Sequence, residues 1–260
     1  MPANDKVIYG APCWVDLTNG NLEGTKAFYH ALFGWEFEDM GEDFGHYNII
    51  TIGEDAVGGC MQYSPEFMGP VEINAWSVFF SQPDAEAALQ TAVAHGGSVV
   101  APAMKVAQQG TNAAAADPTG AAYGVWQPDQ RVGFDRWGEH GFPGWFELQT
   151  RDFDASTAYY SAVLPAELGD EPMPEGMRYK TLNINGMPHA GIYDATTDLP
   201  EGVPNYWAVY FIVNDTDAAV EAAVAQGGTA GPATDSAHGR FAAITDPAGA
   251  FFFVISGEES

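Results

Sequence analysis

The sequence has few basic residues and a large excess of acidic ones. It contains 9 Lys and Arg residues against 35 Asp and Glu residues, which gives a formal net charge of −26 over 260 residues. Such a surface repels phosphate backbones and anionic membranes, so we expect neither a nucleic acid nor a membrane as a partner. Most of these carboxylates are therefore interpreted as a solvated acidic surface.

Cysteines and long hydrophobic runs are also scarce. Cys13 and Cys60 are too few for a disulfide framework, and neither has a second cysteine at metal-ligand spacing. No apolar run reaches the roughly 18 residues that a membrane span needs. The opening MPANDKVIYG has neither the basic nor the hydrophobic region of a signal peptide. We therefore expect a folded cytoplasmic protein in which both cysteines are buried packing residues.

The most informative feature of the sequence is an internal repeat. The stretch CWVDLTNGNLEGTKAFYHALFGW, residues 13–35, returns as GWFELQTRDFDASTAYYSAVLPA, residues 144–166. Trp14 and Trp145 are 131 residues apart, and each is followed two residues later by a carboxylate. Self-similarity over this distance indicates that the chain is a duplicated half.

Each half divides into two modules that begin with a strand and a helix. WVDLT (14–18) alternates as a strand does, and Asn21 then caps an amphipathic helix that Gly34 ends. WSVFF (76–80) repeats this order, and a DPTG turn at 117–120 precedes a final strand. The pattern predicts four modules, over residues 13–75, 76–130, 144–206 and 207–256.

These modules, with AFYHALFGW, AHGGSVV and DPTGAAYGVW at their expected places, resemble the vicinal oxygen chelate superfamily, the fold of glyoxalases, bleomycin-resistance proteins and extradiol dioxygenases. The openings PCWVDL and GWFEL resemble a four-module bacterial branch labelled glyoxalase-like or hydroxylase. The resemblance implies an α+β fold in which four βαβββ modules form two glyoxalase-like domains with cup-shaped mixed sheets. We expect one domain at 1–130, a linker at 131–143 and a second domain at 144–260, each domain around its own core.

The resemblance also implies where metal-using members keep their ligands. Their first strands supply a His or Gln, and the strand after the DPxG turn supplies a Glu. The corresponding positions in this sequence are Trp14, Trp76, Trp145, Trp207, Gly124 and Phe253. None of these side chains binds a divalent ion, and the histidines do not recur between the halves. We therefore expect no metal and no other cofactor.

The paired carboxylates Asp16 and Glu147 are the candidate acid–base residues. Because side chains alternate along a strand, each shares a face with the tryptophan before it, and that face is expected to line a cup. The residues expected to bind a ligand there are Trp14, Thr18, Trp76, Phe80, Trp145, Gln149, Trp207 and Phe211. The alternative interpretation places the rings in the core and pairs the acids with backbone groups or with Arg151 or Arg178.

Three functions remain open from the sequence. The favoured interpretation is a metal-independent protein that binds a small hydrophobic or aromatic metabolite, antibiotics included, in aromatic-lined cups. The second is a metal-free lyase, isomerase or hydroxylase-type enzyme that uses a pocket carboxylate as acid or base. The third is a metal-dependent glyoxalase or dioxygenase, against which the missing ligands count. Either a monomer or a homodimer is compatible with four modules.

We predict that the purified protein holds no stoichiometric transition metal, because Trp14, Trp145, Gly124 and Phe253 stand at the ligand positions. Elemental analysis after mild chelation should find far less than one Zn, Fe, Ni or Mn per chain. A retained ion at about one per chain would contradict this prediction.

Overall fold

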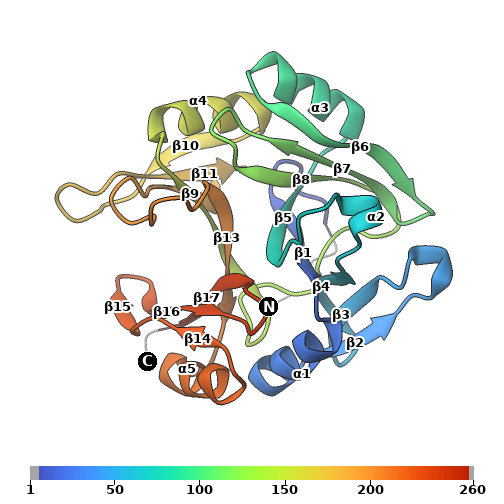
Figure 1. The fold of residues 1–260 in the computed structure, drawn as a ribbon. Helices are drawn as coiled ribbons and strands as arrows, with labels where there is room; N and C mark the ends of the chain where they lie inside the picture. Colours follow the sequence, from blue (N-terminus) through green and yellow to red (C-terminus); the bar gives the residue numbers. More distant parts are fainter. Residues whose placement is uncertain (1–5, 258–260) are drawn as a thin grey trace.

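Two curved sheets, built one after the other along the chain, form the molecule. The computed structural model describes residues 6–257 (Figure 1). The helices of the first half are α1 (Leu22–Phe33), α2 (Pro65–Met68) and α3 (Ala85–Ala94), with a 3-10 turn η1 (Glu42–Phe44). Its strands are β1 (Pro12–Asn19), β2 (Glu36–Asp39), β3 (Asn48–Ile52), β4 (Asp55–Gln62), β5 (Ala75–Ser81), β6 (Ser98–Val106), β7 (Gly110–Ala116) and β8 (Ala122–Pro128).

The second half repeats this order of elements with shorter strands at one edge. Its helices are α4 (Phe153–Val163) and α5 (Thr216–Ala225). Its strands are β9 (Pro143–Thr150), β10 (Glu167–Asp170), β11 (Tyr179–Ile184), β12 (Met187–Asp194), β13 (Tyr206–Ile212), β14 (Thr229–Ala230), β15 (Thr234–Ser236), β16 (Gly239–Thr245) and β17 (Phe251–Ser256). No helix within the described residues is long and apolar enough to cross a membrane.

The strand order pairs the two modules of each half in one sheet. The first sheet runs β2-β3-β4-β1-β5-β8-β7-β6, and the second runs β10-β11-β12-β9-β13-β17-β16-β14, with β15 paired to β16. The two modules of each half meet at an antiparallel pair of strands, β1 with β5 and β9 with β13. Within the modules the first strand pairs in parallel with the last, β1 with β4, β5 with β8, β9 with β12 and β13 with β17. The predicted α+β fold of βαβββ modules with mixed sheets is confirmed.

Side-chain caps start the four longer helices. The carboxamide or carboxylate oxygen of each cap residue accepts a hydrogen bond from the backbone N–H three residues further on. The caps are Asn21, Asp84, Asp152 and Asp215. Gly34 ends α1 in the left-handed conformation, with φ of 74°. These local signals fix where the chain leaves each central strand for its helix.

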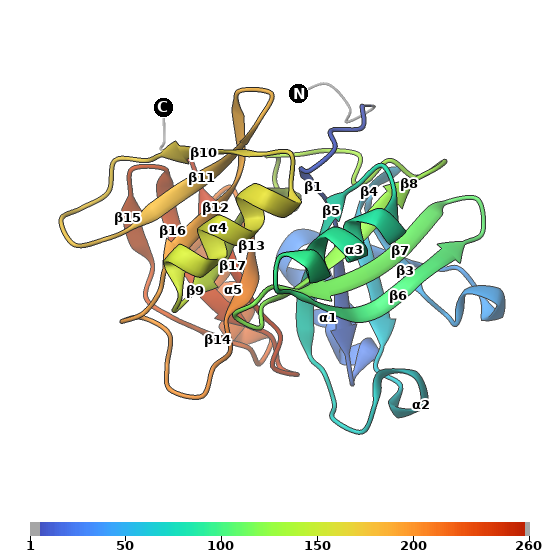
Figure 2. The same cartoon turned by 90° about the horizontal axis from the view of Figure 1, so that it is seen from above.

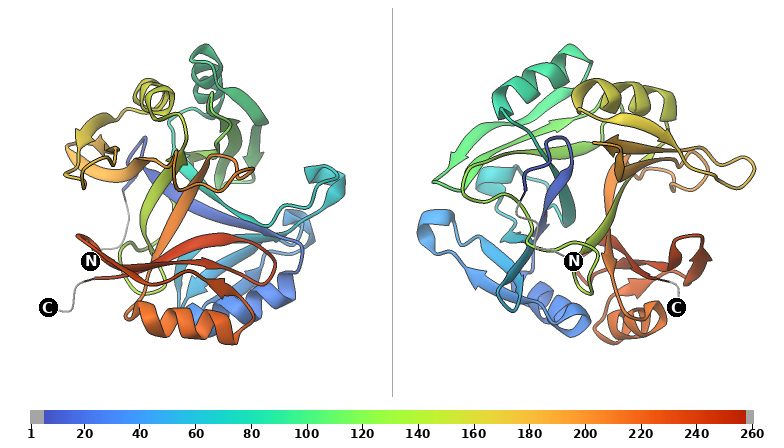
Figure 3. Two further views of the ribbon diagram at one scale, coloured as in Figure 1. Left: turned by 60° about the vertical axis from the view of Figure 1, so that its left-hand side comes forward. Right: turned by 180° about the vertical axis from the view of Figure 1, so that it is seen from behind.

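The two sheets stand back to back, with their concave sides turned away from each other (Figure 1, Figure 3). Helix α1 lies beside α5, and α3 lies beside α4, so the helices close the two ends of the junction (Figure 2). We call the concave side of the first sheet, which carries Trp14 and Asp16, the first concave face. The side of the second sheet that carries Trp145 and Glu147 is the second concave face.

One hydrophobic core, shared by both halves, lies between the sheets. The rings of Phe80 and Trp207 lie 4.9 Å apart between centroids, and those of Trp35 and Phe211 lie 5.0 Å apart. All four side chains are buried. The expectation of separate cores is therefore wrong. A sheet with one apolar side must bury that side against another layer, and here each half supplies that layer for the other.

A buried carboxylate also joins the halves. Asp246, in the DPAG turn, accepts hydrogen bonds through Oδ1 from the backbone N–H groups of Ala248 and Gly249 at 2.9 and 2.8 Å. Its Oδ2 accepts hydrogen bonds from Asn19 Nδ2 at 3.2 Å and from the Tyr29 hydroxyl at 3.3 Å. A turn of the second half is thereby bonded to β1 and α1 of the first.

We predict that urea unfolds both halves in one cooperative transition, because the apolar sides of both sheets are buried in a common core. Far-UV circular dichroism and tryptophan fluorescence should give the same midpoint. Phe252 is fully buried in this core, so Phe252→Ala should lower the free energy of unfolding by about 3–5 kcal/mol and shift both signals together. Two separate transitions in either protein would contradict the prediction.

Candidate functional site

An indole, a carboxylate and a phenol meet on the first concave face. The Tyr47 hydroxyl donates a hydrogen bond to Asp16 Oδ1 at 2.5 Å. Trp14 Nε1 lies 3.0 Å from the same carboxylate oxygen and 2.9 Å from the Tyr47 hydroxyl oxygen, and it donates to both. Trp14 and Asp16 belong to β1, and Tyr47 directly precedes β3. The three side chains form a closed ring of hydrogen bonds, which we call the first acid cluster.

The second concave face carries the same arrangement, which we call the second acid cluster. Trp145 Nε1 donates to the Tyr179 hydroxyl at 2.8 Å, and the Tyr179 phenol is hydrogen-bonded to Glu147. Two more donors reach Glu147 Oε1, the Tyr210 hydroxyl at 2.9 Å and Gln149 Nε2 at 2.5 Å. In both halves, therefore, a phenol accepts a hydrogen bond from an indole and is itself bonded to a carboxylate.

A glycine in the neighbouring strand makes room for each phenol. A Cβ atom at Gly59 on β4 would lie 1.7 Å from the Tyr47 hydroxyl oxygen, and one at Gly191 on β12 would lie 1.8 Å from that of Tyr179. Each glycine is the strand partner of the carboxylate residue in its own half. Any larger residue would push the phenol away from its carboxylate.

Sequence reasoning missed the two phenols, although a signal for them exists. Tyr47 and Tyr179 are 132 residues apart, and so are Gly59 and Gly191, close to the spacing of the repeated tryptophans. An alignment of the repeat through β3 and β4 would have found both pairs. These tyrosines and glycines lie in short apolar stretches whose pattern predicts β-strands and nothing more.

Burial raises the pKa of both carboxyl groups. For Asp16 the pKa rises to about 6, against the opposing effect of the hydrogen bonds from Tyr47 and Trp14. Burial also raises the pKa of Glu147, and its hydrogen bonds again act in the opposite direction. Both side chains keep partial access to solvent. A reachable carboxyl group that titrates near neutral pH can accept or donate a proton.

Four residues expected to line the cups face the core instead, and that expectation is wrong. They are Trp76, Phe80, Trp207 and Phe211. Trp76 Nε1 donates to the Tyr29 hydroxyl at 3.0 Å, and Trp207 Nε1 donates to the Tyr160 hydroxyl at 2.9 Å. Both hydroxyls belong to buried helix residues on the core side of the sheets.

The reason lies in the alternation of side chains along a strand. Trp14 precedes the first residue of α1 by eight positions, whereas Trp76 precedes the first residue of α3 by nine. A difference of one residue reverses the face on which a side chain lies. The concave partners of Trp14 and Trp145 on the neighbouring central strand are instead Phe79 and Tyr210.

The other predicted residues lie where the alternation placed them. Thr18 is half-buried on the first concave face, and Gln149 bonds Glu147 on the second. Neither carboxylate pairs with the arginines of the alternative interpretation. Arg178 pairs with Asp154 and Asp194, and Arg151 donates to backbone carbonyl groups.

The side chains of the concave faces do not fit a divalent metal ion. Each acid cluster holds one carboxylate, and the strand positions beside it carry Phe79, Gly124, Tyr210 and Phe253. Across residues 6–257, no group of three or more His, Cys, Asp or Glu side chains is placed to hold a metal. A divalent ion in a protein site needs about three or more such donors.

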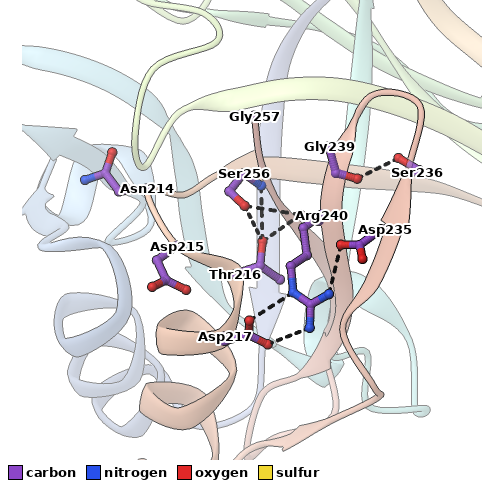
Figure 4. A pocket seen from close by; sticks show the side chains of 10 residues that line it. All are labelled: Asn214, Asp215, Thr216, Asp217, Asp235, Ser236, Gly239, Arg240, Ser256 and Gly257. Carbon is purple, nitrogen blue, oxygen red and sulfur yellow. Dashed lines mark hydrogen bonds and ion pairs between the residues drawn. The ribbon is translucent and has the colours of Figure 1, made fainter. Parts of the chain in front are cut away.

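Two shallow hollows lie away from the acid clusters. One lies at the start of α5, where the Arg240 guanidinium pairs with Asp217 at 2.9 Å and with Asp235 at 2.8 Å (Figure 4). The other lies between α3 and β6, beside Leu89 and Val99. Arg240 is already neutralised by two carboxylates, so the first hollow presents little unbalanced charge to a ligand.

The sequence profile described as "Glyoxalase/Bleomycin resistance protein/Dioxygenase superfamily" matches residues 13–123 and again residues 143–252. The chain belongs to this superfamily. The two matches fall on the two halves of the internal repeat, one on each sheet. Each half of the chain, with its own concave face, therefore has the fold of this superfamily.

Several known proteins are similar to this superfamily member over most of their length. "Putative glyoxylase CFP32" of Mycobacterium tuberculosis is 34% identical over 262 residues, which cover 98% of each chain. "Anthracycline biosynthesis protein DnrV" of Streptomyces peucetius is 32% identical over 265 residues, covering 96% of this chain and 94% of that one.

Two solved structures of the same fold share little sequence with this chain. The Mn(II)-bound glyoxalase from Novosphingobium aromaticivorans gives a TM-score of 0.66 at 14% identity, covering 98% of this chain and 84% of that one. The 2,3-dioxygenase LapB from Pseudomonas sp. KL28 gives 0.64 at 15% identity, covering 96% and 93%. At this identity the likeness extends to the fold and not to the site.

The raised pKa of Asp16 predicts a pH-dependent effect of Asp16→Asn on stability. An unfolded Asp titrates near about 3.9, below the folded value, so the folded protein loses stability relative to the unfolded chain as pH rises from about 4 to about 6. Asparagine carries no charge. The melting temperature of Asp16→Asn relative to the wild-type protein should therefore rise over this interval and level off above it.

Asp39 provides the matched control for this experiment. Hydrogen bonds from the Gly41 backbone N–H and from His46 lower its pKa, so its stabilising effect is present above the unfolded pKa and is lost as pH falls. Asp39→Asn should therefore become less stable relative to the wild-type protein as pH rises to about 4. Thermal melts between about pH 3 and pH 8 measure both differences, and a flat curve for Asp16→Asn would contradict the assignment.

Proposed function

We propose that the protein binds a small hydrophobic or aromatic metabolite, aromatic antibiotics included, on its concave faces without the help of a metal ion. The observation that carries this proposal is the acid cluster, which occurs in both halves as a carboxylate hydrogen-bonded to a phenol that also accepts a hydrogen bond from an indole. In each cluster the carboxylate is the strong acceptor among aromatic groups.

The physical chemistry of the clusters suits such a ligand. An aromatic ring that stacks on another contributes about 0.5–1.5 kcal/mol beyond the burial of its area. A buried carboxylate that receives a ligand N–H or O–H fixes the orientation of that ligand, and hydrogen bonds to a charged group are worth about 1.5–3 kcal/mol. The aromatic side chains therefore provide affinity for the ligand, and the carboxylate fixes its orientation.

The names of two similar proteins point to the same class of ligand. Both DnrV and "Anthracycline biosynthesis protein DauV" of Streptomyces sp. (strain C5), which is 32% identical over 266 residues, are named for the synthesis of anthracyclines. Anthracyclines have a planar polycyclic ring system. The similarity supports a planar aromatic ligand for this chain as well.

The second candidate function is metal-free catalysis by a concave-face carboxylate, as in a lyase, isomerase or hydroxylase-type enzyme. The observation that favours it is the pKa of Asp16, which burial raises to about 6. A carboxyl group in this range takes a proton from a substrate carbon or hydroxyl more readily than an ordinary one. The Tyr47 hydroxyl donates a hydrogen bond to Asp16 Oδ1. It would stabilise the Asp16 carboxylate before the proton transfer and donate to the substrate once Asp16 is protonated. A metal-dependent glyoxalase or dioxygenase activity is disfavoured by the donor set of the concave faces.

The acidic surface and the composition support the remaining parts of the proposal. A net charge of −26 disfavours nucleic acid and anionic membranes as partners. We place the protein in the cytoplasm, acting on a small molecule, as a monomer or a homodimer. Each sheet contains both modules of its half, so a single chain is sufficient for two complete concave faces.

The proposal predicts that Asp16→Asn and Glu147→Gln weaken or abolish the binding of an aromatic ligand while the protein stays folded. The amide keeps the shape of the carboxylate but removes its charge and its affinity for a proton. Titration of the wild-type protein with a panel of neutral, cationic and anionic aromatic compounds, followed by tryptophan fluorescence, should detect binding near Trp14 or Trp145.

Thermal melts of the same two variants and of the double variant separate binding from stability. If the acids are purely structural, the substitutions should cost stability on the order of 1–3 kcal/mol and leave affinity unchanged. That result, or the absence of any binding in the panel together with unchanged melts, would overturn the proposed function.

A further inference from the structure

The second concave face carries more aromatic rings on its strands than the first, which has Phe79 and Trp126 beside Trp14. Those of the second face that lie on β13, β16 and β17 are all partly buried. We call this group the aromatic wall; its members are Tyr206, Tyr210, Phe241, Phe251 and Phe253. At the corresponding positions of the repeat, the first half has Ala75, Phe79, Asn112, Ala122 and Gly124.

The rings of the wall contact one another in a continuous array. Tyr210 and Phe253 are stacked, with centroids 4.4 Å apart and planes at 10°. Phe251 meets Phe253 edge-on at 5.0 Å, and Tyr206 meets Phe251 edge-on at 5.7 Å. Phe241 completes the array at 6.2 Å from Phe253. Ring faces and edges of this kind accept a further flat ring by stacking or by edge contact.

The repeat itself shows that the fold does not require these rings. The first sheet has the same central strand pairing with alanine, asparagine and glycine at four of the five positions. A cluster of large apolar side chains that stays partly accessible on one surface of a protein is typical of a binding site. The wall is therefore interpreted as a platform for a ligand.

Both concave faces carry a carboxylate, and their other charged groups differ. Glu147 accepts a hydrogen bond from Tyr210 of the wall. The charge of Glu171 helps to raise the pKa of Tyr179 in the second acid cluster, and the Glu171 carboxylate lies 3.6 Å from His238. On the first concave face, the Arg131 guanidinium lies 5.7 Å from the centroid of the Trp14 ring and pairs with Asp135 at 3.3 Å. The second face thus combines carboxylates with electron-rich ring faces, both of which attract a cation.

We infer that the second concave face binds a planar polycyclic aromatic molecule that carries a protonated amine. The flat ring system stacks against the aromatic wall, and the amine lies toward Glu147 and Glu171. The inference rests on the proposed function, which it narrows from aromatic molecules on either face to one chemical class on one face. At the positions of Tyr206 and Phe251 the first face has alanine.

Two flat tricyclic probes of opposite charge test the inference, the cation proflavine and the anion anthraquinone-2-sulfonate. Isothermal titration calorimetry at about 0.15 M salt should find one proflavine site per chain and much weaker binding of the sulfonate. The double variant Tyr206→Ala/Phe251→Ala places at these two positions the alanines that the first half has there. It should bind proflavine at least about ten-fold more weakly, whereas Tyr9→Ala, which removes an aromatic ring that is 45% exposed and lies outside both faces, should not.

The outcomes separate the inference from the proposed function. Unchanged proflavine affinity in the double variant would overturn the inference, and so would many cation sites per chain that vanish when salt is raised. Preference for the sulfonate or for neutral aromatics, with affinity lost in Asp16→Asn, would also overturn it but would leave the proposed function standing. Absence of binding by every aromatic compound would overturn both. If the double variant melts at a lower temperature, Tyr206→Ala alone supplies the comparison.

Discussion

The packing of the two sheets against each other is the constraint on which the rest of the structure depends. Trp76 and Phe211 lie 5.1 Å apart between ring centroids, and Phe80 and Trp207 lie 4.9 Å apart. Each ring pair joins the central strands of the two halves. Because these strands bury their apolar sides in a common core, both sheets must turn their concave sides outward, and each acid cluster is presented on its own surface.

Duplication preserved the acid clusters and changed their surroundings. The indole, carboxylate and phenol recur, with the indole donating to the phenol and the phenol bonded to the carboxylate in both halves, and a glycine beside each phenol keeps the space open. The residues that surround them differ, since the first face has an arginine over its tryptophan and the second has a set of aromatic rings. A shared core allows this divergence, because the concave residues do not determine how the halves pack.

Superfamily membership establishes the fold of this chain, whereas the side chains on its concave faces decide which chemistry is possible. The profile match and the similar structures establish the fold over nearly the whole chain. Function depends on the groups that the fold presents, and one fold hosts many chemistries. Here the strand positions beside each carboxylate hold Phe79 and Tyr210 rather than metal-binding donors. The reactive group that each concave face presents is therefore a hydrogen-bonded carboxylate among aromatic rings.

The sequence predicted the local structure well because local signals are strong in this chain. Helix caps such as Asn21 and Asp152 and the DPxG turns act within a few residues, and the repeat fixed the order of the modules. The same alternation rule correctly placed Asp16 and Glu147 beside their tryptophans. The rule failed for Trp76 and Trp207, which were expected on the concave faces and lie in the core.

What the sequence alone determined about this protein is its duplication, its βαβββ modules and a carboxylate on the same face as each leading tryptophan. Only the tertiary structure decided that Tyr47 and Tyr179 reach those carboxylates from another strand, and that the halves share one core. The physical reason is the range of the interactions. A strand or a cap depends on neighbours in the chain, whereas a strand's buried face and its partners across the sheet depend on register, which a single residue reverses.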